Sequence, residues 1–216
     1  NELRVDPSEH SVLITSKVDA PKSQKERLTQ LLFETFQVPA VHIENAQCLA
    51  LYSAGRTTGV VVDIGASGVD VVPVYEGYAL PHAATTSGAI GGDQVTDYFQ
   101  RILTERGYAF TTTAERDVVR HLKETLCAAS AAATSLTSSG PTGSSSTGSL
   151  DYEMPDGNVI TVGDERFRAC EVLFQPSLIG SESSGLSELV MNAISKCDVD
   201  IRKDLCGNIL LCGGGS

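Results

Sequence analysis

The spacing of apolar and polar residues divides the first part of the chain into short strands and helices. Residues 11–15 predict a short buried strand, and residues 23–37 carry apolar side chains at helical spacing. A second helical pattern begins at Ala46 and ends at Gly55, because glycine commonly closes a helix. A strand followed by a helix is typical of an α/β layer. We therefore expect an α/β fold.

A strand and a hairpin follow. Residues 58–62 are a run of β-branched residues and glycine, which predicts a strand that stops at residues 63–65. Residues 69–74 and 78–80 flank Glu76-Gly77, and this arrangement predicts two antiparallel strands joined by a tight turn.

The second half of the chain is mostly helical. Residues 88–106 and 113–127 have helical patterns, and Thr113 is the predicted N-cap of the second helix. Strands are expected at 151–154 and 159–162, joined by a Pro-Asp-Gly-Asn turn. The remaining predicted elements are helices near 164–173, 184–197 and 198–206, and a last strand at 209–211.

A low-complexity segment interrupts this half. Residues 128–149 are nearly all Ala, Ser, Thr and Gly, with Leu136 the one large apolar residue before the segment closes. Such a composition cannot bury enough apolar surface to offset the entropy of ordering. We expect a mobile, disordered insertion that a nonspecific protease cuts first.

The net charge and the hydropathy of the chain disfavour several classes of binding partner. The 216 residues carry a formal charge of −11 with a pI near 4.7, which disfavours binding to nucleic acid or to anionic lipid. The longest apolar runs are strand-sized, well below the roughly 18–20 residues that span a bilayer. Because no signal peptide is visible at the N-terminus, we expect an intracellular protein without membrane contact.

The cysteines are scattered singly. No CxxC pair or His at zinc spacing accompanies them, so a metal cluster is not expected. Reduced thiols, mostly in cores, are the prediction for an intracellular chain. They stand at positions 48, 127, 170, 197, 206 and 212.

Two glycine turns follow strands and suggest anion binding. Residues 63–68 place Asp63 at a strand end beside small residues, where backbone N–H groups can approach a phosphate and the carboxylate can hold a water of a hydrated cation. The alternative is an ordinary turn. Residues 211–216 contain three consecutive glycines that let a flat base lie against the backbone, or else form a flexible chain end or a cloning remnant.

A third group lies between these turns. Arg120, Lys123 and Glu124 share one helical face, since residues three and four apart are neighbours on a helix. Basic groups bind phosphate and ribose oxygens, and a carboxylate accepts from ribose hydroxyls. A solvated, salt-bridged face is the alternative interpretation.

Longer blocks of sequence carry a more specific signal than these short motifs. Residues 103–116, Leu-Thr-Glu-Arg-Gly-Tyr-Ala-Phe-Thr-Thr-Thr-Ala-Glu-Arg, resemble the actin stretch of the same length almost residue for residue. Further blocks occur in the actin order across the chain outside the low-complexity segment. They are residues 1–5, 55–59, 75–82, 167–168, 173–177 and 197–205. The chain thus resembles the actin family.

The resemblance implies a fold and a set of site residues. The fold is the α/β, ribonuclease H-like fold shared by actin, Hsp70 and sugar kinases, in which two lobes close on ATP and a divalent ion. Asp63 matches the carboxylate that holds Mg or Ca through water. The remaining matches are Gly65 and Ser67 in the second phosphate loop, Gly92 in the cleft, Arg120, Lys123 and Glu124 around ribose and adenine, and Gly213 and Gly214 beside adenine.

The resemblance fails at residues that act on the attacking water. The family's water-orienting Gln falls on Ala46, with Gln47 one place on, and one helical step rotates a side chain by about 100°. The family's His falls on Asp70, and an Asp of the phosphate loop falls on Ala66. Because phosphoryl transfer relies on positioning, hydrolysis should be slow or absent, with Gln47 the remaining catalytic candidate.

The resemblance covers the central and C-terminal part of the family pattern, without its first phosphate loop and its C-terminal end. It implies a larger lobe from residues 1–82 and about 200–216, like subdomain 3 with part of subdomain 1. Residues 88–197, with the insertion 128–149, would form a smaller lobe like subdomain 4. A closed two-lobe clamp is not expected from these residues alone.

The implied function is that of a divergent actin-related protein. We expect a cytoskeletal or scaffolding role in the cytoplasm or nucleus, with at most residual ATP or ADP binding; the alternative is an active ATPase of the same superfamily. Its partners would be proteins, in a filament or a complex. Residues 174–180 predict an exposed apolar contact patch, with Leu178 and Ile179 at its centre, or else a buried loop core.

Overall fold

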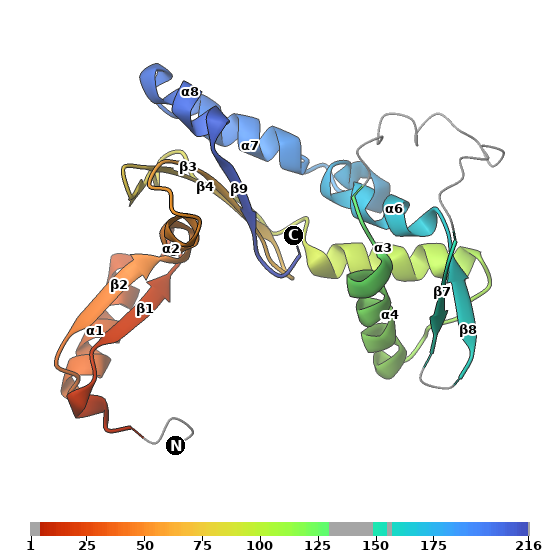
Figure 1. Cartoon of the computed structure of the whole chain (residues 1–216), viewed down its shortest axis with the longest axis horizontal. Coiled ribbons are helices and arrows are strands. Elements are labelled where there is room, and N and C mark those ends of the chain that lie inside the picture. The colour runs from red at the N-terminus through yellow and green to blue at the C-terminus, as the bar shows by residue number, and fades with distance from the viewer. Residues whose placement is uncertain (1–4, 130–148, 155–156, 216) are drawn as a thin grey trace.

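The computed structural model describes residues 5–129, 149–154 and 157–215. Its elements form three groups that follow one another along the long axis of the molecule (Figure 1). They are an N-terminal pair of strands with a helix, a central mixed sheet, and a helical group with a hairpin. Mixed sheets flanked by helices confirm the α/β class. Most of the predicted insertion, residues 130–148, lies outside the described residues.

The N-terminal group is a small parallel unit. After a short 3-10 turn at Pro7–Glu9, β1 (Val12–Ser16) pairs in parallel with β2 (Val41–Asn45), and α1 (Lys22–Glu34) connects them. The strand predicted at 11–15 is present, but the prediction that it is buried is wrong. Leu13 is 58% exposed, because a sheet of two strands covers little of its own surface.

The central sheet has the strand order β5-β4-β3-β9, with β6 also paired to β4. β3 runs antiparallel to β4 and parallel to β9, so the sheet is mixed. The predicted hairpin is confirmed, and Glu76 and Gly77 at its turn both have positive φ, at 50° and 87°. The elements are α2 (Ala46–Ser53), β3 (Gly59–Ile64), β4 (Val69–Tyr75), β5 (Tyr78–Ala79), β6 (Thr85–Ser87) and β9 (Ile209–Cys212).

Helices cover both faces of this sheet. Val60, Val62 and Ile64 share one buried cluster with residues of α7 (Leu186–Ser195) and α8 (Val199–Gly207), which lie along the same face in Figure 1. Val61 faces the other way and packs with Cys48 and Leu51 of α2. Because both faces are buried, β3 reads as a continuous apolar run rather than an alternating one.

The helical group contains α3 (Gly92–Glu105), α4 (Thr113–Leu126), α6 (Glu165–Cys170) and a hairpin of β7 (Leu150–Glu153) and β8 (Val159–Val162). Short 3-10 turns follow at Glu171–Leu173 and Pro176–Ile179. The predicted cap of α4 is off by one residue. The hydroxyl of Thr112 accepts the N–H of Glu115 at 3.3 Å, and the Glu115 carboxylate accepts the N–H of Thr112 at 2.8 Å.

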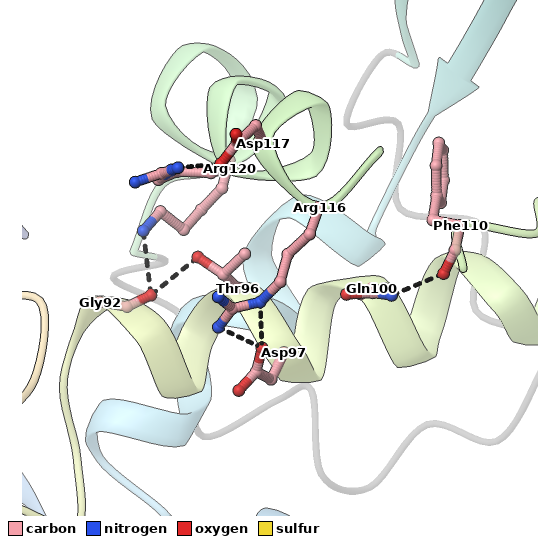
Figure 2. Close-up of polar contacts among 9 residues, drawn as sticks. Gly92, Thr96, Asp97, Gln100, Phe110, Arg116, Asp117 and Arg120 are labelled. Atoms are coloured by element: carbon pink, nitrogen blue, oxygen red, sulfur yellow. Dashed lines mark hydrogen bonds and ion pairs between the residues drawn. The ribbon is translucent and has the colours of Figure 1, made fainter. Parts of the chain in front are cut away.

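Side chains join α3 to α4. Arg116 pairs with Asp97 at 2.7 Å, and the amide of Gln100 donates to the carbonyl of Phe110 at 2.6 Å (Figure 2). The buried cluster beneath them is continuous with the cluster of the central sheet. The division into two lobes therefore stays a prediction, and α7, which contacts β3 and β4, is described here with the sheet.

At residues 178 and 179 the structure favours the second interpretation of this segment, a loop core, over an exposed contact patch. Leu178 and Ile179 are half-buried and pack against the buried side chains of Tyr98, Ile102 and Val172. They belong to a small core, because the 3-10 turn at Pro176–Ile179 folds them onto α3. Elsewhere among the described residues, no helix is long and apolar enough to cross a membrane.

Candidate functional site

The two glycine turns meet at one edge of the central sheet. β3 and β9 are parallel, so their carboxyl ends lie together, as the register of Asp63 opposite Cys212 shows. The N–H of Gly215 donates to the carbonyl of Ile64 at 2.8 Å and ties the triple glycine to the end of β3. In α/β sheets, ligands bind outside the carboxyl ends of strands.

Gly213 and Gly214 differ in the space around them. Gly213 has φ +98°, and a Cβ added there would lie 2.4 Å from the carbonyl oxygen of Ile64 and 2.6 Å from Oδ1 of Asp63. A side chain is therefore excluded at 213. Nothing lies within 4 Å of a Cβ placed on Gly214, so its backbone is open to a ligand.

The loop after β3 is fixed by the start of α3. The N–H of Gly65 donates to the carbonyl of Gly68 at 2.8 Å. The N–H groups of Gly92 and Asp93 donate to the carbonyls of Gly65 and Ala66 at 2.9 and 2.8 Å. These first amides of α3 fix the position of the loop.

A cavity of about 330 Å³ opens beside this edge. Lys123 and Glu124 line it, and the Lys123 ammonium donates to the carbonyl of Gly92 at 3.0 Å. Gly92 and Gly214 line it as well, so the structure brings four predicted residues together. Its apolar wall includes Ile64, Leu173, Phe174, Leu186 and Leu211.

Five of the nine predicted nucleotide-site residues lie outside the wall of this cavity, namely Asp63, Gly65, Ser67, Arg120 and Gly213. Arg120 pairs with Asp117 on the same helix, and its side chain is about half exposed (Figure 2). Ser67 is exposed on the loop after β3. Neither belongs to the cavity wall, although Arg120 shares a helix with Lys123.

Asp63 faces the opposite side of the sheet, toward α2. The amide nitrogen of Gln47 donates to its Oδ2 at 3.2 Å. Gln47 is only 4% exposed, and its Oε1 is buried without a hydrogen-bond partner. Gln47 and Asp70 line a second, smaller cavity of about 80 Å³ together with Lys17.

The larger cavity contains groups of the kinds that bind a nucleotide. The larger cavity combines an apolar wall for a base with a cation, a carboxylate and open glycine backbone. For a divalent ion, the described residues contain no group of three or more His, Cys, Asp or Glu that could enclose it. Asp63, with one oxygen on Gln47, suits a hydrated ion held through water, since Mg²⁺ keeps several waters and binds few carboxylates.

A comparison of the sequence with protein-family models gives a match. The family model described as Actin matches residues 1–216. The chain belongs to the actin family. The resemblance seen in the sequence blocks is confirmed, and with it the actin-like α/β fold. The roles of individual actin-family site residues stay predictions.

The structure locates the residues that depart from the actin pattern. Ala46 is the first residue of α2. Its methyl group has no hydrogen-bond donor or acceptor and cannot orient a water, whereas the amide of Gln47 donates to Asp63. Asp70 lines the smaller cavity with Gln47, and Ala66 is exposed on the loop after β3. Of these positions, Asp70 lies opposite Asp63 in the register of β3 and β4.

Sequence reasoning missed several residues of these walls. Gly215 belongs to the triple glycine, so it could have been identified from the sequence. Lys17 reaches the smaller cavity only because the loop after β1 approaches α2, and no local signal shows this. Cys127 and Cys170 line the larger cavity although they are 43 positions apart in the numbering, which no motif joins.

Proposed function

We propose that this actin-family chain binds ATP or ADP with Mg²⁺ or Ca²⁺ and serves as a scaffolding or cytoskeletal protein with slow or no hydrolysis. The observation that supports nucleotide binding is the meeting of two glycine turns beside a cavity that holds Lys123 and Glu124.

Each residue has a task in this proposal. Lys123 pairs with phosphate or ribose oxygens, and Glu124 accepts hydrogen bonds from ribose hydroxyls. Gly213 and Gly214 present backbone to the base. Ser67 offers its backbone N–H group to phosphate oxygens, and Gly65 fixes the loop because its own N–H donates to the carbonyl of Gly68. Asp63 accepts a hydrogen bond from a water of the cation. When bound, the cation neutralises phosphate charge.

Calorimetric titration with Mg-ATP tests this proposal. We expect saturable binding that weakens when EDTA removes the cation. Asp63→Asn should reduce the dependence on the cation, because a neutral amide holds hydrated Mg²⁺ less well. Asp200→Asn, an exposed carboxylate on α8, is the matched control and should bind like the parent protein. Absence of saturable binding up to millimolar nucleotide would contradict the proposal.

An active ATPase is the second candidate, because Gln47 places an amide beside Asp63. If water positioning is what the chain lacks, Ala46→Gln combined with Asp70→His should raise ATP turnover a few-fold, since the rate of phosphoryl transfer depends on orientation. Phosphate release measures this. The single change Ala50→Gln, on the same helix, is the control. A parent rate equal to that of ordinary actin, lost in Gln47→Ala, would favour the second candidate.

We propose further that the function is exercised through protein contacts in the cytoplasm, the cytoskeleton or the nucleus. The charge of −11 favours a partner with a basic or neutral face, and such charge affects the rate of association more than its strength. Sedimentation with and without Mg-ATP distinguishes a polymer from a subunit that needs another protein.

A further inference from the structure

Two thiols stand in the wall of the larger cavity. Cys127 directly follows α4, and Cys170 is the last residue of α6. Both are half-buried and line the same space as Lys123. The N–H of Ala128 donates to the carbonyl of Arg166 at 3.4 Å, so the backbone just after Cys127 is joined to the first turn of α6, four residues before Cys170.

The two thiols differ in acidity. Hydrogen bonding from Cys127 would stabilise the Cys170 thiolate and lowers the pKa of Cys170, and the Lys123 ammonium acts in the same direction. The same interaction, followed by burial, raises the pKa of Cys127. Cys170 is therefore the nucleophile of the pair, and Cys127 is the thiol placed to react second.

The other cysteines have different surroundings. Burial raises the pKa of the thiols of Cys48, Cys197 and Cys212, which disfavours their reactive thiolates. Cys206 is exposed on α8. It is reachable by reagents and makes a natural internal control.

We propose that Cys127 and Cys170 form a redox-active dithiol, which a peroxide converts to a disulfide in the wall of the cavity. This modification site goes beyond the proposed nucleotide binding, and the formation of the disulfide does not depend on it.

The reaction balances with hydrogen peroxide as the oxidant. The Cys170 thiolate attacks one peroxide oxygen, the O–O bond breaks, and the departing hydroxide takes a proton to give water. Cys170 is then a sulfenic acid. Cys127 attacks its sulfur, the S–S bond forms, the S–O bond breaks, and a second water leaves. Two thiols lose two electrons, and one peroxide gains them.

Oxidation should alter the nucleotide site, a consequence that rests on the proposed function. A disulfide draws the sulfurs to about 2.05 Å, closer than any hydrogen bond. The N–H of Cys127 donates to the carbonyl of Lys123 at 3.0 Å, so displacement of Cys127 is passed to the turn that carries Lys123. By linkage, bound nucleotide should slow the oxidation in turn.

Peptide mapping of the full chain tests the dithiol. The reduced protein is treated with hydrogen peroxide, alkylated, digested and analysed by mass spectrometry. We expect a Cys127–Cys170 disulfide that dithiothreitol reverses. Cys127→Ser should leave a Cys170 sulfenic acid that dimedone traps, and Cys170→Ser should oxidise more slowly at position 127. Cys206→Ser should still form the disulfide. Preferential oxidation of Cys206, or a Cys48–Cys212 disulfide in its place, would overturn the proposal.

An arsenical gives a second measurement on the unmutated chain, in case a serine variant folds poorly. Phenylarsine oxide bridges two adjacent thiols, so it should protect Cys127 and Cys170 from alkylation while Cys206 stays reactive. Equal alkylation of Cys127 and Cys170 with and without the reagent would overturn their pairing. Repeating the peroxide reaction with Mg-ATP should slow it several-fold. An unchanged rate would overturn the link to nucleotide and leave the dithiol standing.

Discussion

Replacing Gly213 with alanine is expected to lower the free energy of unfolding by about 3 kcal/mol, because the change combines backbone strain with overpacking. At φ +98° an L-residue is strained, and the new Cβ would meet the carbonyl oxygen of Ile64 at 2.4 Å. The clash with this carbonyl cannot relax easily, because Ile64 is the last residue of β3 and its carbonyl accepts the N–H of Gly215.

Gly214→Ala is the matched control for this change. The same methyl group added one residue later meets nothing within 4 Å, so stability should stay close to that of the parent protein. Urea unfolding followed by circular dichroism measures both variants. Equal losses of stability at 213 and 214 would mean that the triple glycine is not packed against the end of β3.

Replacing Lys123 with methionine is expected to weaken Mg-ATP binding by about 10- to 100-fold. Methionine keeps much of the length of the side chain but removes the ammonium, and a hydrogen bond to a charged group contributes about 1.5–3 kcal/mol. Lys123 is the right residue to change, because its ammonium already reaches the carbonyl of Gly92 in the cavity wall.

Arg120→Met provides the control for Lys123→Met. It removes the same charge one turn earlier on α4, where the guanidinium pairs with Asp117 outside the cavity wall. Calorimetry should show affinity within a few-fold of the parent protein. If both variants lost affinity equally, a general loss of positive charge, and not a contact from Lys123, would explain the effect.

Local signals in the sequence predicted most of the elements. The hairpin at Glu76-Gly77 could be anticipated because a tight turn requires positive φ and the flanking residues are β-branched. The β-branched residues at 58–62 likewise predicted β3. β6 was missed because Thr85–Ser87 is short and polar, and it becomes a strand only by pairing with β4.

Burial was harder to predict than secondary structure. β1 has the composition of a core strand, yet Leu13 is exposed because the strand has one neighbour. Leu178 and Ile179 resemble a surface patch beside Gly180, yet they pack on α3. In both cases burial depends on which elements pack against each other, and the residues of a short segment do not reveal its packing partners.

The sequence identified individual residues of the candidate site but did not show which of them lie together. Asp63, Gly92, Lys123 and Glu124 were identified from motifs and from the family resemblance, and the structure places the last three in one wall. The separation of Asp63 onto the other face of the sheet follows from strand alternation. The proximity of Cys127 to Cys170 depends on the packing of α4 and α6, which spacing along the chain does not reveal.

The parallel pairing of β3 with β9 also fixes when the site can form during synthesis. The ribosome releases residues 59–64 early, but their neighbour at 209–212 emerges only after every helix of the described chain. Until then β3 presents an open edge, and such edges favour association with other chains. The two glycine turns would thus come together only after residues 209–215 have left the ribosome, and the edge of β3 would stay open to other chains until then.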